Sequence, residues 1–102
     1  PTTFDEQVVA KKWNDDVVKV LSAYREALIN IEYVTAEVAK STLETVTTQL
    51  DVPTGKILQA LRTSITGGAS GPDLMMTIEI LGKNEVVNRI RYALKNLKVK
   101  VA

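Results

Sequence analysis

Apolar residues recur along nearly the whole chain at the three- and four-residue spacing of helices, and glycine or proline interrupts the pattern between stretches. No stretch before the terminus alternates as a strand would. The sequence therefore predicts an all-α fold, a compact helical bundle or cage of five or six helices, in a single domain over 1–102. We expect residues 1–12 and 98–102 to fray.

Capping and breaking residues place the predicted helices. A first helix is expected from about Asp5 to Lys12, with Asn14 or Asp15 capping the second and Thr35 the third. Gly67-Gly68 ends the fourth, Pro72 occupies the first turn of the fifth, and Gly82 ends that helix. Each predicted helix from the second to the sixth has a stripe of apolar residues expected to face inward. The stripes are Val17, Leu21, Tyr24, Leu28 and Ile31 in the second helix; Ala39, Leu43, Val46 and Leu50 in the third; Ile57, Leu58, Leu61 and Ile65 in the fourth; Leu74, Met75, Ile78 and Leu81 in the fifth; and Val86, Ile90, Ala93 or Leu94, and Leu97 in the sixth.

The composition excludes several kinds of chemistry. The chain contains neither cysteine nor histidine, so disulfides, thiol nucleophiles, Ser-His pairs and the usual zinc sites are ruled out. We expect no catalytic residues, no metal ligands and no cofactor. No run approaches the ~18 apolar residues of a membrane span, so no membrane partner is expected. The N-terminus lacks signal-peptide features and reads as the middle of a longer protein. The absence of cysteine fits a cytoplasmic origin.

Charge is divided unevenly between the two halves. Residues 1–51 hold five Lys/Arg and nine Asp/Glu, and residues 52–102 hold eight Lys/Arg and three Asp/Glu, giving −4 and +5. The C-terminal half is therefore the better candidate for binding a polyanion such as nucleic acid. A solvated charged surface explains the same excess equally well.

Polar residues recur on the predicted fourth helix. Lys56, Gln59, Arg62 and Thr66 are three or four positions apart and are expected to share one face, away from the apolar residues. A planar guanidinium beside an amide and a hydroxyl suits hydrogen bonding to bases or phosphates. The alternative is an ordinary exposed face, with Arg62 paired to an acidic residue such as Glu37 or Glu44.

Three further features have a structural and a functional interpretation. Gly67, Gly68 and Gly71 precede a helix, where amide groups can hold a phosphate, but a tight turn is the simpler explanation. Trp13 is more typical of a core anchor than of a base-stacking residue. Met75 and Met76 are expected to fill packing space.

Several short motifs follow one another in an order known from one family. Gly55-Lys56 is followed by Leu61-Arg62 and then by Thr66-Gly67. Ser70-Gly71-Pro72-Asp73-Leu74, Leu81-Gly82-Lys83 and Arg89-Ile90 come next, and Lys11-Lys12-Trp13 stands ahead of them all. This arrangement resembles the C-terminal anticodon-binding domain of bacterial-type glutamyl-tRNA synthetases, in detail over about 52–94.

The resemblance implies a helical cage that grips the anticodon loop of tRNA. It implies that Arg62 contacts anticodon bases and that the loop of Ser70, Gly71 and Pro72 is a second contact region. Members of the family carry Thr where this chain has Gly71, so only Ser70 offers a hydroxyl there. The parent enzyme would be a class I glutamate–tRNA ligase that uses ATP and magnesium, with the rest of the synthetase as this domain's partner. The class I catalytic motifs are absent, so this chain alone is expected to bind and not to catalyse.

Two other functions fit a small helical bundle. A DNA-binding helix-turn-helix would use the fourth and fifth helices, although residues 67–71 are longer than the usual turn of about three to four residues. The fifth helix also carries little positive charge for the major groove. A protein-interaction bundle without a nucleic-acid role is the other alternative.

Overall fold

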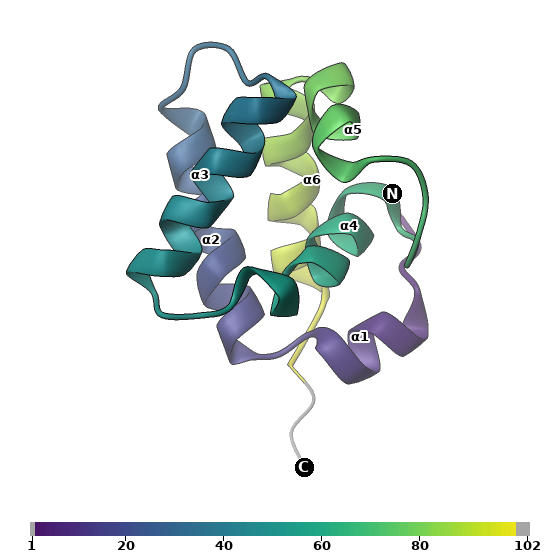
Figure 1. Ribbon diagram of the computed structural model, residues 1–102. Coiled ribbons are helices and arrows are strands. Elements are labelled where there is room, and N and C mark those ends of the chain that lie inside the picture. Colours follow the sequence, from purple (N-terminus) through teal and green to yellow (C-terminus); the bar gives the residue numbers. More distant parts are fainter. Residues whose placement is uncertain (1, 100–102) are drawn as a thin grey trace.

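The computed structural model describes residues 2–99 and builds them entirely from helices and connecting segments (Figure 1). No strand occurs within this range, so the predicted all-α bundle is confirmed. None of these helices has the length and apolar character that crossing a membrane demands. The elements in chain order are α1 (Glu6–Lys12), α2 (Asp15–Ile29), α3 (Ala36–Gln49), the short 3₁₀ turn η1 (Thr54–Lys56), α4 (Leu58–Thr66), α5 (Leu74–Leu81) and α6 (Lys83–Asn96).

Four of the helices begin at a side chain that caps them. The side-chain oxygen of each capping residue accepts a hydrogen bond from the backbone N–H three positions on, which satisfies a donor that has no partner inside the helix. The predicted caps of the second and third helices, Asn14 and Thr35, are confirmed. The cap and donor pairs are Asp5 with Val8, Asn14 with Val17, Thr35 with Val38, and Asp73 with Met76.

The predicted position of Pro72 is wrong. The fifth helix begins at Leu74 and is capped by Asp73, so Pro72 lies outside it in the preceding loop. Asp73 caps α5 because its carboxylate accepts a hydrogen bond from Met76 N at 3.0 Å, which a proline side chain cannot do. At the other end Gly82 ends the helix with φ 86°, as expected for a glycine stop.

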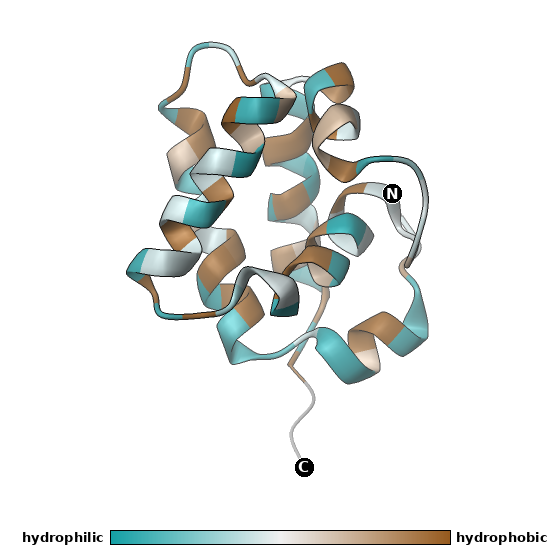
Figure 2. Ribbon diagram, in the orientation of Figure 1, coloured by the Kyte–Doolittle hydropathy of each residue, from teal (hydrophilic) through white to brown (hydrophobic). Residues whose placement is uncertain are grey.

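The helices enclose one core, with α6 packed against both α2 and α4 (Figure 1). The pairs α2–α3, α3–α5 and α1–α4 also pack together. Hydrophobic segments face the interior of the bundle (Figure 2). Trp13 is buried in this core, so the interpretation of Trp13 as a core anchor is confirmed. The largest fully buried side chains are Tyr24, Leu21, Leu28, Leu43, Ile57, Leu61, Ile65, Ile78 and Ile90.

Two residues expected on inward helical stripes differ from the prediction. Leu58 is 39% exposed, because the buried face of α4 runs through Ala60, Leu61 and Ile65 and leaves Leu58 at its edge. Ile31 packs against the core but lies beyond the end of α2 at Ile29. The other predicted inward residues are buried or pack partly against the core.

Charged side chains from the C-terminal half hold helix ends in the other elements. Lys83 Nζ donates to Ile31 O at 2.6 Å and to Ile29 O at 3.3 Å, at the C-terminal end of α2. Glu79 Oε1 accepts from Ala36 N at 2.8 Å, at the start of α3. These charges complement the negative and positive ends of the two helix dipoles. They therefore fix the α5–α6 junction against the α2–α3 connection.

The N-terminal segment is tied to the end of α4. Asp5 N donates to Gly67 O at 2.8 Å, and Val8 of α1 is buried. Fraying of residues 2–12 in solution stays a prediction, as does that of Lys98 and Val99. Residue 1 and residues 100–102, which also fall in the predicted frayed ends, lie outside the described part of the chain.

Tyr24 makes the only buried tyrosine hydrogen bond among residues 2–99, to Ala39 O at 2.9 Å. Burial raises the pKa of the Tyr24 phenol. The folded state therefore keeps this proton when an unfolded tyrosine loses it, near pH ~10. The contribution of the protonated Tyr24 phenol to the free energy of unfolding is complete below that pH and is lost as the pH rises above it.

Tyr24→Phe is expected to lower the free energy of unfolding by about 1 kcal/mol at neutral pH. Because only the tyrosine protein gains an ionised phenol on unfolding, its advantage over Tyr24→Phe should shrink above pH ~10. Urea denaturation of both proteins between neutral pH and pH ~11 measures this difference. A constant difference across the range would contradict the assignment.

Candidate nucleic-acid interface

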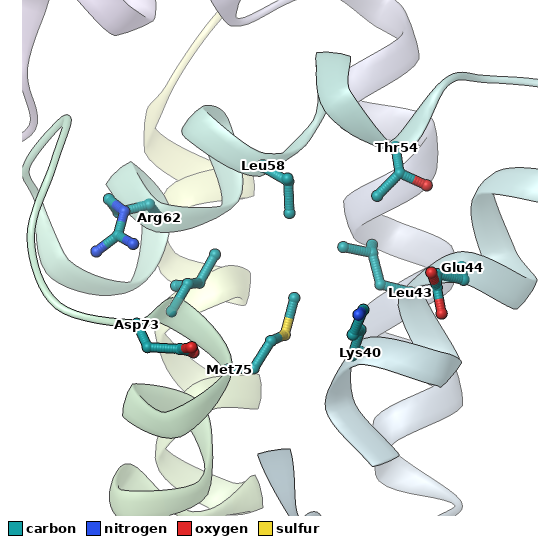
Figure 3. Close-up of a pocket in the computed structure, with 9 residues that line it drawn as sticks. Lys40, Leu43, Glu44, Thr54, Leu58, Arg62, Asp73 and Met75 are labelled. Atoms are coloured by element: carbon teal, nitrogen blue, oxygen red, sulfur yellow. The ribbon is translucent and has the colours of Figure 1, made fainter. Parts of the chain in front are cut away.

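A hollow of about 400 Å³ opens between α3, α4 and α5, and Arg62 lies on its wall. Arg62 and Asp73 lie along one side of the hollow and Lys40 with Glu44 along the other (Figure 3). Leu58 and Met75 lie between them. The hollow thus combines cationic, anionic and apolar walls, which suits a planar group with polar edges.

Arg62 is half-buried and forms no ion pair with any residue in 2–99. Glu44 lines the same hollow but does not pair with it, and Glu37 is exposed on α3. The alternative in which Arg62 serves as a structural salt bridge to Glu37 or Glu44 is therefore absent from the structure. Its guanidinium donates no hydrogen bond to the described residues, so its N–H groups remain available to a ligand.

The loop after α4 lies beside Arg62 and is held by side chains of α4. Thr63 Oγ1 donates to Gly68 O at 2.8 Å, and Gly68 N donates to Thr66 Oγ1 at 3.2 Å. Gln59 Nε2 donates to Ala69 O at 3.4 Å. Gln59 and Thr66 therefore have a structural task in addition to their predicted role, because both order the loop that follows.

The seven residues predicted to bind RNA do not form one cluster. Gln59, Arg62 and Thr66 share α4, whereas Lys56 lies in η1 and is not on the predicted helical face, because α4 begins only at Leu58. The structure brings Arg62 next to the loop that contains Ser70, Gly71 and Pro72, all three of which are exposed. Lys56 is exposed and does not line the hollow.

Gly71 makes room for Arg62. A Cβ at Gly71 would lie 3.2 Å from Arg62 Nη1, and the glycine has φ 155°, which a residue with a side chain rarely adopts. Gly71 thus leaves room for the Arg62 guanidinium. No hydroxyl takes part at this position.

Gly71→Ala is expected to lower the free energy of unfolding by about 1–3 kcal/mol through backbone strain and to displace the Arg62 guanidinium. The matched control is Gly55→Ala, because nothing lies within 4 Å of a Cβ at Gly55. Urea denaturation of the two variants measures the difference. Equal stability of both variants would show that alanine at position 71 causes no backbone strain.

The sequence did not predict that Lys40 lines the hollow, one turn from Glu44 on α3, and it named Glu44 only as a possible ion-pair partner of Arg62. It also did not predict that Asp73, on the same side as Arg62, and Met75, at the start of α5, line the hollow. The Asp73 carboxylate was recognisable as a cap before an apolar run. Nothing in the sequence places α3 opposite Arg62, because that depends on how the helices pack.

The described residues contain no group of three or more acidic, histidine or cysteine side chains that could hold a metal ion. Arg89, one of the motif residues, does not face the hollow. Its Nη1 donates to Ile65 O at 2.9 Å and its Nε pairs with Glu85 at 2.8 Å. Arg89 therefore joins α6 to the last turn of α4.

Comparison with known proteins places the chain in a family. The sequence model of a family described as an anticodon binding domain matches residues 1–94. The chain belongs to this family.

The chain is similar to glutamate–tRNA ligases. It is 50% identical to the glutamate–tRNA ligase of Cytophaga hutchinsonii over 103 residues, which covers 99% of this chain and 20% of the relative. It is 32% identical to the glutamate–tRNA ligase of Porphyromonas gingivalis, and the match covers 95% of this chain and 19% of the relative. The chain thus spans about a fifth of the length of the curated relatives it matches.

A solved structure has the same fold. The crystal structure of a glutamate tRNA ligase from Elizabethkingia meningosepticum, in complex with its amino acid, matches with a TM-score of 0.87 and 30% identity. The match covers 96% of this chain and 19% of that one. These comparisons give no support to a helix-turn-helix or to a protein-interaction bundle. Within α5 the only charged residue is Glu79, which also disfavours major-groove binding.

Proposed function

We propose that the chain is the anticodon-binding module of a glutamate–tRNA ligase and that it grips the anticodon loop of tRNA. The observation that carries the proposal is the half-buried Arg62, which has no acidic partner among residues 2–99 and lies on the wall of a hollow with room for a base. Family membership and the similar ligases support the same conclusion.

The hollow offers the contacts that a splayed-out base needs. Single-stranded RNA loops are recognised by stacking and by hydrogen bonds to base edges. Arg62 supplies paired donors, and Leu58 and Met75 supply apolar surface. The loop of Ser70, Gly71 and Pro72, together with Gln59, Lys56 and Thr66, extends this contact toward the neighbouring nucleotides.

Catalysis belongs to the rest of the synthetase in this proposal. The chain has no histidine and no phosphate-binding Gly-Lys-Ser/Thr motif, so attachment of glutamate with ATP and magnesium is assigned to the other domains of a cytoplasmic parent enzyme. The module itself positions the tRNA. It needs no cofactor for that task.

A gel shift with three probes tests the proposal. The chain is expected to bind a glutamate anticodon stem-loop more tightly than an RNA stem-loop with an unrelated loop, and more tightly than duplex DNA. Binding should weaken with salt, because Lys and Arg contacts release counterions from phosphates. Preference for duplex DNA would favour the helix-turn-helix alternative, and no binding to any probe would favour a protein-interaction role.

A further inference from the structure

The outward face of α6 carries a basic patch with an exposed aromatic ring. Asn88, Arg91, Tyr92 and Lys95 line a surface hollow of about 430 Å³, which we call the α6 patch. No acidic residue lines it, and neither Arg91 nor Lys95 forms an ion pair within 2–99. Its positive charge is therefore not neutralised by the described part of the protein.

Arg91 and Lys95 repel each other electrostatically in the unbound protein. Arg91 and Lys95 are four residues apart, so their like charges are neighbours on the helix surface and repel each other. Arg89 on the same helix is neutralised by Glu85 and points to α4. A bound polyanion would relieve the repulsion between Arg91 and Lys95, which indicates the charge of the partner.

Tyr92 adds a feature that a general counterion surface lacks. Its side chain is 42% exposed although it is large and aromatic. The ring stacks on Phe4, with centroids 6.1 Å apart and an interplanar angle of 27°. A ring that a neighbour already holds loses little freedom when another planar group stacks on it. Cations beside an available aromatic face are the combination found on surfaces that bind single-stranded nucleic acid.

The α6 patch is separate from the hollow at Arg62. The two hollows share no residue, and α6 turns Ile90 and Ala93 into the core. We propose that the α6 patch is a second RNA-binding surface, at which Arg91 and Lys95 contact phosphates and a base stacks on Tyr92. This inference rests on the proposed function for the identity of the polyanion. Unlike the proposed function, the inference predicts RNA contacts that do not depend on the anticodon sequence.

Fluorescence anisotropy with a glutamate anticodon stem-loop, its anticodon variants and an unstructured oligouridylate tests the inference. Lys95→Gln should weaken binding to every probe and reduce the slope of log K against log salt by roughly 0.7–0.9. Lys19→Gln removes the same charge from the exposed surface of α2 and should leave the slope unchanged. Tyr92→Leu should weaken binding to every probe by about fivefold or more, and Tyr92→Phe should restore it.

Tyr33→Leu is the control for the aromatic ring, because Tyr33 is 71% exposed on the connection between α2 and α3. Circular dichroism of each variant verifies that it is folded. Weaker binding of the Lys95 and Tyr92 variants than of their controls supports the inference, and equal binding overturns it. Equal binding also makes an acidic protein surface the better partner for the patch.

The outcomes separate this inference from the proposed function. If the wild-type chain prefers the glutamate anticodon while Tyr92→Leu and Lys95→Gln bind RNA as well as their controls, RNA binding by the α6 patch is overturned and the proposed function stands. If both variants weaken binding but the wild-type chain has no anticodon preference, RNA binding by the α6 patch stands and anticodon recognition by the chain fails. Absence of RNA binding by the wild-type chain overturns both.

Discussion

Leu61→Ala should lower the free energy of unfolding by about 2–5 kcal/mol. Leu61 is fully buried, and its truncation leaves a cavity among the side chains that join α4 to the core. Proteins of this kind are stable by only ~5–15 kcal/mol, so the loss is a large part of the total. Urea denaturation followed by circular dichroism gives the difference between variant and wild type.

Leu58→Ala is the matched control, since the same side chain is removed from the same helix. Leu58 is 39% exposed and should cost less, about 1 kcal/mol, because it leaves water only in part. A loss at Leu58 equal to or greater than that at Leu61 would contradict the orientation of α4, and with it the exposure of Arg62 to the hollow.

Arg62→Lys should reduce discrimination between anticodon variants by about 1–3 kcal/mol at the contacted base, although it preserves the charge. A guanidinium meets two acceptors on a base edge at once, a geometry that an ammonium group cannot reproduce. Binding of the chain to the glutamate anticodon stem-loop and to single-base variants of it measures the effect.

Lys95→Gln supplies the comparison for Arg62→Lys. It removes a charge from an exposed side chain near the end of α6 and should weaken all anticodon variants slightly and equally. If Arg62→Lys instead lowers stability and leaves the anticodon preference intact, the base-reading role of Arg62 must be abandoned.

The helices could be predicted from sequence because their signals are local. Apolar spacing depends on the geometry of one helix, and the caps at Asn14 and Thr35 act within a single turn. Errors appeared where two local signals competed, as with Pro72 and Asp73. They also appeared at Leu58, an apolar residue at the edge of a stripe, which is partly exposed and lines the hollow at Arg62.

The site could be predicted only in part, because a site is made by elements far apart in the chain. Arg62 and the loop after it are close in sequence, and the structure places Gly71 of this loop beside Arg62. Their contact with RNA stays a prediction. Lys40 and Glu44 come from α3, and their position depends on packing that no short motif reveals. For the same reason the roles of Lys83 and Arg89 as partners of helix-end carbonyls were not predicted.

The hydrogen bonds that hold the loop after α4 affect the thermodynamics of binding. Backbone carbonyls of Gly67, Gly68 and Ala69 are each engaged by a donor from Asp5, Thr63 or Gln59. The loop is thus ordered when the domain folds, and RNA that meets it does not have to order it again. Association at this surface should therefore have a small entropic penalty on the protein side, and the ordering of the RNA loop should account for most of the entropy lost.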